Sequence, residues 1–546
     1  MASAVLQISD LEIRLANGAA SGAILEKVSL NLVEGETMCL VGESGSGKTV
    51  TALSVMGLLP VADLRVASGS IRLAGEELVG ASQHRLRELR TTRMAMIFQE
   101  PMAALNPVMT IGRQIDEVLS AHTGLRRLER RERVEDMLAQ VELPDVKRIA
   151  AAYPHQLSGG QRQRAMIAMA LILQPKLLIA DEPTSALDVR TQKQILDLMR
   201  RLRDQHGTAI LFVTHDMGVV AEIADHVAVM QQGRIVENGL LKNVFEAAKH
   251  NHTKKLLAAV PHLRPREART ATSDEMVLEA QSLSKGYRNT AWLQPQQHVD
   301  AVIDVDLALR KGRTLGIVGE SGSGKSTLAR CLLRLIEPSK GRILLGKTDI
   351  TALSRTALTR YRRDIQIVVQ DPYRSLNPRL SVADIITEGP LNFGVARVQA
   401  LEKAAELLGL VGLPSKLLRA LPHQLSGGQR QRVALARALA LEPRVLVADE
   451  AVSALDMSTQ AEILRLLADL QKRLGLAMLF VTHDLRVAAQ VCDDVAIMQG
   501  GRIVEQGPAA DVLIRPRHAY TQALVEAVPG RHWNFAAPKP AEATLS

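Results

Sequence analysis

Short apolar runs alternate with helical patterns along the chain, and these runs occur in matching pairs. Two runs end at glycine-rich loops, Met38 to Val41 and Leu315 to Val318. Two end at paired carboxylates, Leu177 to Ala180 and Val445 to Ala448. Two end at histidines, Ile210 to Val213 and Met478 to Val481. Strands that carry polar residues at their carboxyl ends, with helices between them, are typical of a parallel sheet in an α/β fold. The segment Arg113 to Ala152 has mainly helical signals, so we predict a helical subdomain there.

The order of these segments repeats, which indicates two copies of one fold. GESGSGKT at Gly42 to Thr49 returns as GESGSGKS at Gly319 to Ser326, and PHQLSGGQRQR at Pro154 to Arg164 returns at Pro422 to Arg432. From this second motif onward the copies keep a constant offset of 268 residues. We predict a first domain over residues 1–260, a polar, proline-containing linker over 261–276, a second domain over 277–530 and a flexible tail over 531–546.

Length and composition agree with a globular protein of more than one domain. The chain has 546 residues, 47% hydrophobic and 23% charged, whereas single domains usually stop growing near ~250 residues. The longest apolar stretches, such as Gly475 to Thr482, are far shorter than the ~20 residues of a membrane-spanning helix, so we expect no span. The segment Met1 to Ser9 lacks the pattern of a secretion signal, so we expect a cytoplasmic location.

Charge and cysteine usage exclude some partners. The net charge of +9 could suit nucleic acid or an anionic membrane surface, but the basic residues are spread along the chain. Aromatic residues make up only 2%, which argues against a nucleic-acid platform built by base stacking. Cys39, Cys331 and Cys492 lack metal-ligand spacing, and we interpret them as buried thiols.

The glycine-rich loops have the pattern G-x-x-x-x-G-K-[ST] between a strand and a helix, which is the context of a phosphate-binding loop. Glycines let backbone N–H groups surround a phosphate at a helix N-terminus, and Lys48 or Lys325 neutralises its oxygens. Thr49 or Ser326 can ligate Mg²⁺. A chance turn is the alternative interpretation, and the in-frame duplication argues against it.

A pair of acidic residues follows a buried strand in each copy. Asp181 or Asp449 can hold magnesium, and the adjacent Glu182 or Glu450 can polarise an attacking water. A helix N-cap with a first-turn acid would be the better interpretation without the upstream loop. The loop makes the catalytic interpretation the stronger one.

One glutamine and one histidine recur with the acids. Gln99 and Gln370 follow apolar strands and are candidate sensors of the γ-phosphate and magnesium. His215 and His483 each lie 33 residues beyond the glutamate, at the end of a strand. Lone histidines are mostly structural, but this identical register places both beside the acid, where each can contact the γ-phosphate.

The LSGGQ segments, Leu157 to Gln161 and Leu425 to Gln429, open helices with small residues. A serine hydroxyl and unhindered glycine N–H groups at a helix N-terminus can bind an anion. The alternative is a capped helix that binds nothing, and the fixed spacing to the acids in both copies argues against it.

Together these residues resemble the ATP-binding-cassette superfamily over nearly the whole chain. The first copy matches through Gly42 to Thr49 (Walker A), Gln99 (Q-loop), Leu157 to Gln161 (signature), Asp181 and Glu182 (Walker B), Ser185 to Asp188 (D-loop) and His215 (switch histidine). The second copy matches through Gly319 to Ser326, Gln370, Leu425 to Gln429, Asp449, Glu450, Ser453 to Asp456 and His483. The resemblance implies two P-loop NTPase (RecA-like) cassettes, each with an antiparallel β subdomain and a helical subdomain, arranged head-to-tail.

The motifs and the resemblance give three sets of candidate site residues. The catalytic residues are Glu182, His215, Glu450 and His483. The residues that bind ATP are Gly42, Ser44, Gly45, Ser46, Gly47, Lys48, Thr49, Val50, Gln99, Ser158, Gly159, Gly160, Gln161, Tyr287, Gly319, Ser321, Gly322, Ser323, Gly324, Lys325, Ser326, Thr327, Gln370, Ser426, Gly427, Gly428 and Gln429. The residues around Mg²⁺ are Thr49, Gln99, Asp181, Ser326, Gln370 and Asp449.

Further segments narrow the resemblance. QEPMAALNP, QDPYRSLNP and the C-terminal HAYTQALVEAVP, echoed by HNHTKKLLAAVP, look like the oligopeptide, dipeptide and nickel importers. The fused arrangement is similar to the Yej-type peptide importers and to the ATPase of the glutathione importer. Several relatives bind an iron-sulfur centre through cysteines near this C-terminal segment. This chain has none there, so we expect no cluster.

The resemblance also implies that the cassettes pair within the chain. The signature of one copy would close over the ATP that the other copy holds, so Ser426 to Gly428 would complete the site of Lys48, and Ser158 to Gly160 that of Lys325. Relatives stack the adenine on an aromatic residue. Tyr287 fits this place in the second copy, whereas Leu15 lies opposite it in the first.

We therefore predict the ATP-hydrolysing subunit of an importer for peptides or peptide-like solutes. The resemblance implies two transmembrane permease subunits, an indirect solute-binding protein, no nucleic acid, and a peripheral place at the cytoplasmic face of the bacterial inner membrane. A soluble tandem cassette protein acting on ribosomes or DNA is the alternative, but the short linker and the scattered cysteines disfavour it. A bare nucleotide-binding module is disfavoured by the two complete acid–histidine sets.

Overall fold

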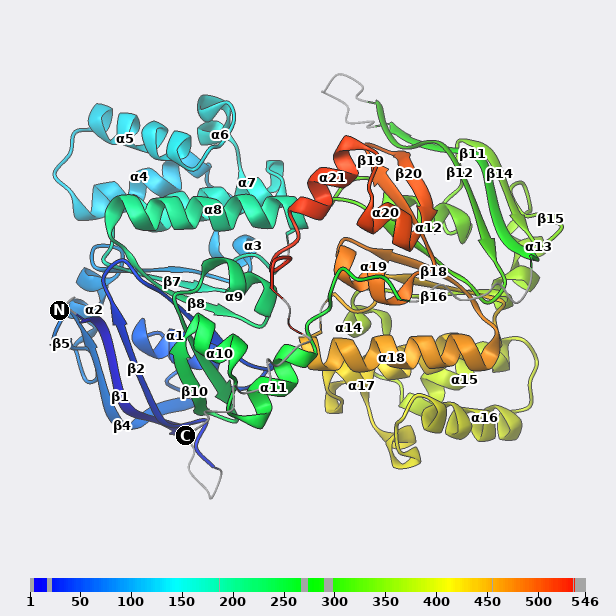
Figure 1. Ribbon diagram of the computed structural model, residues 1–546, viewed down its shortest axis with the longest axis horizontal. Coiled ribbons are helices and arrows are strands. Elements are labelled where there is room, and N and C mark those ends of the chain that lie inside the picture. Colours follow the sequence, from blue (N-terminus) through cyan, green and yellow to red (C-terminus); the bar gives the residue numbers. More distant parts are fainter. Residues whose placement is uncertain are drawn as a thin grey trace, which may run out of the picture. The chain divides into compact units, whose positions relative to one another are not determined.

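The structure is a computed structural model that describes residues 4–16, 22–185, 187–266, 274–288, 298–453, 455–533 and 535, and its chain divides into two compact units (Figure 1). The first unit holds the chain up to residue 187, residues 191–260 and the C-terminal residues from 529. The second holds residues 188–190 and 261–528. Residues 267–273 of the predicted linker and residues 534 and 536–546 of the predicted tail lie outside the described residues.

The first unit contains an antiparallel sheet and a mixed sheet. The order of the antiparallel sheet is β2 (Leu25–Val33), β1 (Ala4–Leu15), β4 (Leu64–Leu73), β5 (Glu76–Glu77). The order of the mixed sheet is β10 (Arg234–Leu240), β9 (His226–Gln231), β3 (Thr37–Val41), β8 (Ala209–Thr214), β7 (Leu177–Asp181), β6 (Met94–Ile97). Neighbours in the mixed sheet are parallel except β10 and β9, which confirms the predicted α/β fold.

Some helices of the first unit cover the mixed sheet, and others form the predicted helical subdomain (Figure 1). The subdomain contains α4 (Ile111–His122), α5 (Arg127–Gln140) and α6 (Val146–Ala151). The other helical segments are α1 (Lys48–Val55), α2 (Gln83–Leu89), α3 (Pro101–Ala104), η1 (Pro154–Gln156), α7 (Gly159–Leu171), α8 (Val189–His206), α9 (Met217–Ile223), α10 (Leu241–Glu246) and α11 (Asn251–Ala258).

The second unit repeats both sheets. Its antiparallel sheet has the order β12 (His298–Arg310), β11 (Met276–Arg288), β14 (Lys340–Leu345), β15 (Thr348–Asp349). Its mixed sheet has the order β16 (Ile365–Val368), β17 (Val445–Asp449), β18 (Ala477–Thr482), β13 (Thr314–Val318), β19 (Asp494–Gln499), β20 (Arg502–Pro508). Again only the last pair, β19 and β20, is antiparallel.

The helices of the second unit follow the same order. They are α12 (Lys325–Leu332), α13 (Arg355–Thr359), η2 (Arg360–Arg363), α14 (Pro372–Ser375), α15 (Val382–Asn392), α16 (Arg397–Leu410), η3 (Ser415–Arg419), η4 (Pro422–Gln424), α17 (Gly427–Leu439), α18 (Met457–Leu474), α19 (Leu485–Val491), α20 (Ala509–Ile514) and α21 (Ala519–Glu526). In the part of the chain that the structure describes, no helix has both the length and the apolar character needed to cross a bilayer.

The central parallel strands form the rigid part of each unit. Every residue of β3, β7 and β8 is buried, because helices cover both faces of a parallel sheet. Phe212 on β8 and Phe480 on β18 are fully buried in the two sheets. The loops at the carboxyl ends of these strands are therefore held by a packed core.

The cysteines lie in this core. Cys39, Cys331 and Cys492 are buried and free, which agrees with their interpretation as buried thiols. Burial raises the pKa of the Cys331 thiol to about 11 and raises the pKa values of Cys39 and Cys492 as well. These thiols therefore stay protonated at neutral pH and fill space in the core.

The last described residues pack on the first unit. The Gly530 N–H donates to Glu222 Oε1 at 3.0 Å, and the ring centroid of Trp533 lies 5.3 Å from that of Phe245 on α10. Phe535 also lies against Phe245, at 5.7 Å. The predicted tail thus begins with packed aromatic residues.

Candidate active sites

Each phosphate loop connects a buried strand to a helix that begins at the loop lysine. β3 leads into the first loop and α1 begins at Lys48, while β13 and α12 frame the second loop in the same way. Gly47 and Gly324 precede these helices with φ of 105° and 101°, in the left-handed region that favours glycine. The N–H groups of the first turn therefore face the loop, where they can bind an anion.

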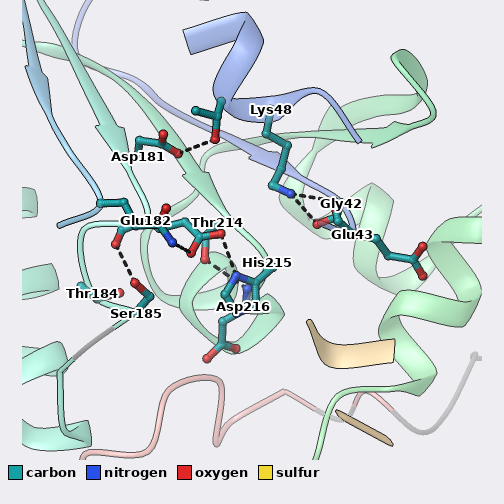
Figure 2. A network of polar contacts seen from close by, with 12 residues as sticks. Gly42, Glu43, Lys48, Asp181, Glu182, Thr184, Ser185, Thr214, His215 and Asp216 are labelled. Atoms are coloured by element: carbon teal, nitrogen blue, oxygen red, sulfur yellow. Dashed lines mark hydrogen bonds and ion pairs between the residues drawn. The ribbon is translucent and has the colours of Figure 1, made fainter. Parts of the chain in front are cut away.

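The loop lysines fold back onto their own loops. Lys48 Nζ donates to the carbonyl oxygens of Gly42 and Glu43, both at 2.8 Å (Figure 2). Lys325 Nζ donates to those of Gly319 and Glu320 at 2.8 and 2.7 Å. Both lysines are buried, and burial lowers the pKa of Lys325. A buried ammonium held by loop carbonyl oxygens is well suited to bind phosphate oxygens.

The first acid of each pair lies beside the hydroxyl that follows the loop lysine. The Thr49 hydroxyl donates to Asp181 Oδ1 at 3.4 Å, and the Ser326 hydroxyl donates to Asp449 Oδ1 at 3.2 Å. Burial raises the pKa of Asp181 to about 6 and also raises that of Asp449. A hydroxyl and a carboxylate that converge in this way are hard oxygen donors of the kind that Mg²⁺ prefers, so these residues fit the ion.

The second acid of each pair is bound to the histidine that follows the next strand. His215 Nδ1 lies 2.9 Å from Glu182 Oε1, and His483 Nδ1 lies 3.3 Å from Glu450 Oε1. Burial alone would raise the pKa of each glutamate, but the hydrogen bond and charge of its histidine lower it below the usual value. Burial alone would lower the pKa of each histidine, but the glutamate raises it. The sequence-predicted acid–histidine sets therefore come together in both units.

The backbone at these glutamates is unusual. Glu182 and Glu450 have φ of 47° and 50°, although residues other than glycine rarely adopt positive φ. Their N–H groups donate to the carbonyl oxygens of Val213 and Val481 at 2.9 Å. In each unit the backbone therefore turns directly after its last hydrogen bond to the neighbouring strand. Ser185 and Ser453 donate to the carbonyl oxygens of the same glutamates at 3.2 and 3.0 Å. This strained turn points each carboxylate at its histidine.

The Q-loop glutamines differ between the units. Gln99 Nε2 donates to Glu182 Oε2 at 3.0 Å, so both carboxylate oxygens of Glu182 are engaged. Gln370 is exposed at the end of β16, and within the described ranges no hydrogen bond joins it to Glu450. The two glutamates thus have different surroundings, although each is paired with its histidine.

The signature segments form capped helix N-termini. Ser158 Oγ accepts the N–H of Gln161 at 3.3 Å, and Gln161 Oε1 accepts the N–H of Ser158 at 3.1 Å, which is a capping box. Ser426 and Gln429 make the same pair of bonds at 3.3 and 3.0 Å. Among the described residues, no hydrogen bond joins either signature to the phosphate loop of its own unit. Each signature is therefore held by its own capping box rather than by the phosphate loop of its unit.

The candidate adenine contacts lie at the ends of equivalent strands. Leu6 pairs with Leu73 and Leu278 pairs with Leu345, so β1 and β11 have the same register. Tyr287 is exposed near the end of β11, and Lys285 Nζ lies 5.3 Å from its ring centroid. The last residue of β1, Leu15, is also exposed.

The structure adds a contact to the second loop that the sequence reasoning did not assign. Tyr520 on α21 accepts a hydrogen bond from the N–H of Glu320, at 3.3 Å. The signal available in the sequence was the echo between the segments around Tyr520 and His252. It places a tyrosine and a histidine at one equivalent position.

Comparisons with known proteins match both halves of the chain. The family model described as ABC transporter matches residues 25–185 and 302–453. The model described as Oligopeptide/dipeptide transporter, C-terminal region, matches residues 236–288 and 504–539. Both models therefore match twice, once in each copy.

Named relatives match over nearly the full length. The chain is 46% identical over 528 residues to the peptidoglycan transport ATP-binding protein YejF of Agrobacterium fabrum, covering 96% of each. It is 44% identical over 557 residues to the glutathione import ATP-binding protein GsiA of Salmonella typhimurium, covering 96% of this chain and 89% of that protein. A solved dimeric ATP-binding cassette in a post-hydrolysis state with ADP and Pi matches 42% of this chain at 29% identity, with a TM-score of 0.39.

Proposed function

The chain belongs to the ABC transporter family, and from that premise we propose that it powers the uptake of peptides or peptide-like solutes through separate membrane subunits. It is a tandem ATP-binding subunit of an ABC importer, with ATPase activity coupled to transport. The substrate class is supported by the oligopeptide/dipeptide C-terminal region in both copies, and by relatives named for peptidoglycan transport and glutathione import.

In the proposed reaction each unit supplies one complete catalytic set. Glu182 or Glu450 accepts a proton from the attacking water, and His215 or His483 orients that carboxylate and the γ-phosphate. Glu182 holds hydrogen bonds to His215 and Gln99 through separate oxygens, so the attacking water must share an oxygen with one of these partners or displace it. We expect the Gln99 bond to open, because the histidine is the buried and charge-assisted partner.

Mg²⁺ belongs to this proposal as well. Its candidate ligands are Thr49, Asp181 and Gln99 in the first site and Ser326, Asp449 and Gln370 in the second. When bound, the ion neutralises charge on the β- and γ-phosphate oxygens. Asp181 and Asp449, whose pKa values are raised by burial, ionise more readily beside a divalent cation.

The cassettes are proposed to pair head-to-tail within the chain, for a chemical reason. A phosphate loop binds one side of a triphosphate, so the γ-phosphate needs donors from elsewhere to be enclosed. The capped signature helices offer these donors. We therefore assign Ser426 to Gly428 to the site of Lys48, and Ser158 to Gly160 to the site of Lys325.

The proposal has further parts. ATP favours closure because it binds both cassettes, and hydrolysis reopens them. The partners are two permease subunits and, indirectly, a solute-binding protein. The protein is peripheral at the cytoplasmic face of the bacterial inner membrane, has no iron-sulfur cluster, and has the domain bounds 1–260, 277–530 and linker 261–276.

The test is reconstitution with two co-expressed permease subunits in liposomes. We expect co-purification of all three proteins and ATP-dependent uptake of a labelled oligopeptide, with loss of uptake in a Lys48→Ala, Lys325→Ala chain. Lys242→Ala, which changes an exposed lysine of α10, is the matched control and should transport normally. A chain that hydrolyses ATP but neither binds permease subunits nor supports uptake of any peptide would contradict the proposal.

A further inference from the structure

A buried ring from the last helix of the second unit lies against the phosphate loop. Tyr520 on α21 is only 6% exposed, and its Oη accepts the N–H of Glu320 at 3.3 Å. The carbonyl oxygen of the same residue, Glu320, accepts a hydrogen bond from Lys325 Nζ at 2.7 Å. One loop residue therefore connects the tyrosine to the loop lysine.

The first unit has a different ring at this position. His252 on α11 is also 6% exposed, but its Nε2 is buried and has no hydrogen-bond partner among the described residues. The carbonyl oxygen of Glu43 still accepts from Lys48 Nζ at 2.8 Å. The first loop thus keeps its lysine contact and lacks the bond to the ring, because an imidazole is shorter than a phenol.

The two helices otherwise begin alike. Glu505 Oε1 and Oε2 accept the N–H groups of Arg517 and His518 at 2.8 and 3.1 Å, and His518 Nδ1 accepts the N–H of Tyr520 at 3.2 Å. The same bonds, at the same distances, run in the first unit through Glu237, Lys249, His250 and His252. The difference at the loop therefore comes from the ring itself and not from where the helix begins.

The contact between the start of the loop and a neighbouring strand is also the same in both units. A Cβ on Gly319 would lie 2.2 Å from the carbonyl oxygen of Met498 on β19, and one on Gly42 would lie 2.4 Å from that of Met230 on β9. The start of each loop is thus packed against a strand. Among the described residues, only the second loop also has a hydrogen bond to the ring on the C-terminal helix of its unit.

We propose that Tyr520 is a positioning residue for the second phosphate loop: its hydroxyl holds the Glu320 N–H and so presets the loop and Lys325 for a nucleoside triphosphate. A loop that is ordered beforehand loses less conformational entropy on binding, so the second site binds ATP more tightly than the first. The C-terminal helix thereby controls the affinity of one ATP site. This inference rests on the proposed function of Lys325 as a triphosphate-binding group.

The phenol is suited to this task. Burial raises the pKa of Tyr520 to about 12, so the hydroxyl stays neutral at physiological pH and can accept the N–H. Burial lowers the pKa of His252, so its ring is mainly neutral and its Nε2 lacks a bond that a longer side chain could make. A tyrosine in place of His252 is therefore expected to supply the missing contact.

The experiment measures ATP affinity at one site at a time, in the full chain with its permease subunits. Glu182→Gln and Glu450→Gln stop hydrolysis, and Lys48→Ala disables the first loop. Tyr520→Phe should then raise the Kd for ATP about fivefold, the effect of one hydrogen bond, without changing the thermal midpoint. Tyr361→Phe, which removes a hydroxyl elsewhere in the same unit, should leave Kd unchanged. An unchanged Kd in Tyr520→Phe would overturn the proposal.

Two further measurements separate positioning from a general structural role. In the hydrolysing chain, Tyr520→Phe should raise KM for ATP and leave kcat unchanged, whereas general damage would lower kcat and the thermal midpoint. In a chain with Lys325→Ala, His252→Tyr should lower Kd at the first loop, and an unchanged Kd would contradict the inference even if Tyr520→Phe did not fold. ATP binding that survives both Lys48→Ala and Lys325→Ala would instead contradict the proposed function.

Discussion

The two cassettes share the groups proposed to hydrolyse ATP and differ in the groups proposed to hold the nucleotide. Glu182 with His215, and Glu450 with His483, form equivalent bonds at 2.9 and 3.3 Å. In contrast, Leu15 and His252 in the first unit stand where Tyr287 and Tyr520 stand in the second. Because duplication kept the chemistry and varied the surroundings, we expect two competent sites that bind ATP with unequal affinity.

The largest effect is expected for the two glutamates, which both cassettes share. Glu182→Gln combined with Glu450→Gln should slow ATP hydrolysis by about 10²-fold or more while ATP binding remains, because the general base is lost. Each single variant should impair its own site to a similar degree. The measurement is steady-state ATPase activity beside ATP binding. Unchanged turnover in the double variant would remove both glutamates from the mechanism.

The signature glycines should also behave alike in the two units. A Cβ on Gly160 would lie 2.6 Å from Thr191 Cγ2, and one on Gly428 would lie 2.5 Å from Thr459 Cγ2. Gly160→Ala should therefore displace the start of α7 and lower ATPase activity about tenfold or more. Thr191→Ser, which removes only the obstructing methyl group, should be tolerated alone and should restore activity to Gly160→Ala. No restoration would show that the clash is not the cause.

The adenine contacts should separate the two units. Tyr287→Leu should raise the Kd for ATP at the second site about threefold to tenfold, and Leu15→Tyr should lower it at the first, as expected for gain or loss of ring stacking. Each Kd is measured with the loop lysine of the other site replaced by alanine. Equal effects of Tyr287→Leu and a neutral substitution, such as Tyr287→Phe, would contradict stacking.

The smallest expected effect concerns pH. His215 and His483 have raised pKa values, so their stabilising contribution is complete below the unfolded value of about 6.5 and is lost as pH rises through the folded value. Glu182 and Glu450 have lowered pKa values, so their contribution is lost as pH falls below about 4.3. The thermal midpoint of the wild-type protein should therefore exceed that of the double variant His215→Gln, His483→Gln by at most about 2 °C. This difference should be found mainly between the two pH limits just given.

A thermal scan across pH 4 to 9 checks this prediction, with the buffer ionisation enthalpy matched between points. The difference in thermal midpoint between the wild-type protein and the double variant should become smaller as the pH rises through the folded pKa of the histidines. A difference that grows with pH would mean that the histidines are neutral in both pairs.

Much of the fold was predictable because it is encoded locally. Fully apolar runs such as Leu177 to Ala180 predict buried parallel strands, and the polar motifs that follow them define their direction. The antiparallel sheets were predicted only from the family resemblance, because β1 and β11 contain bulges that interrupt their alternation of apolar and polar residues. The acid–histidine sets were predictable because they lie at the ends of neighbouring parallel strands.

Other features depend on contacts that no local pattern contains. Tyr520 lies 200 residues from Glu320 in the sequence, and neither segment shows that they meet. The positive φ of Glu182 arises from the turn after β7, and a strand-end acid pair does not reveal it. The hydrogen bond that Gln99 makes and Gln370 lacks among the described residues is likewise not predicted by the two loop sequences.

The most direct test of the central claim is a structure of the Glu182→Gln, Glu450→Gln chain with ATP, Mg²⁺ and its permease subunits. We predict that the triphosphate on Lys48 accepts hydrogen bonds from Ser426 to Gly428, and that the one on Lys325 accepts them from Ser158 to Gly160. Two bound triphosphates that each contact only the cassette of their own loop lysine would contradict it.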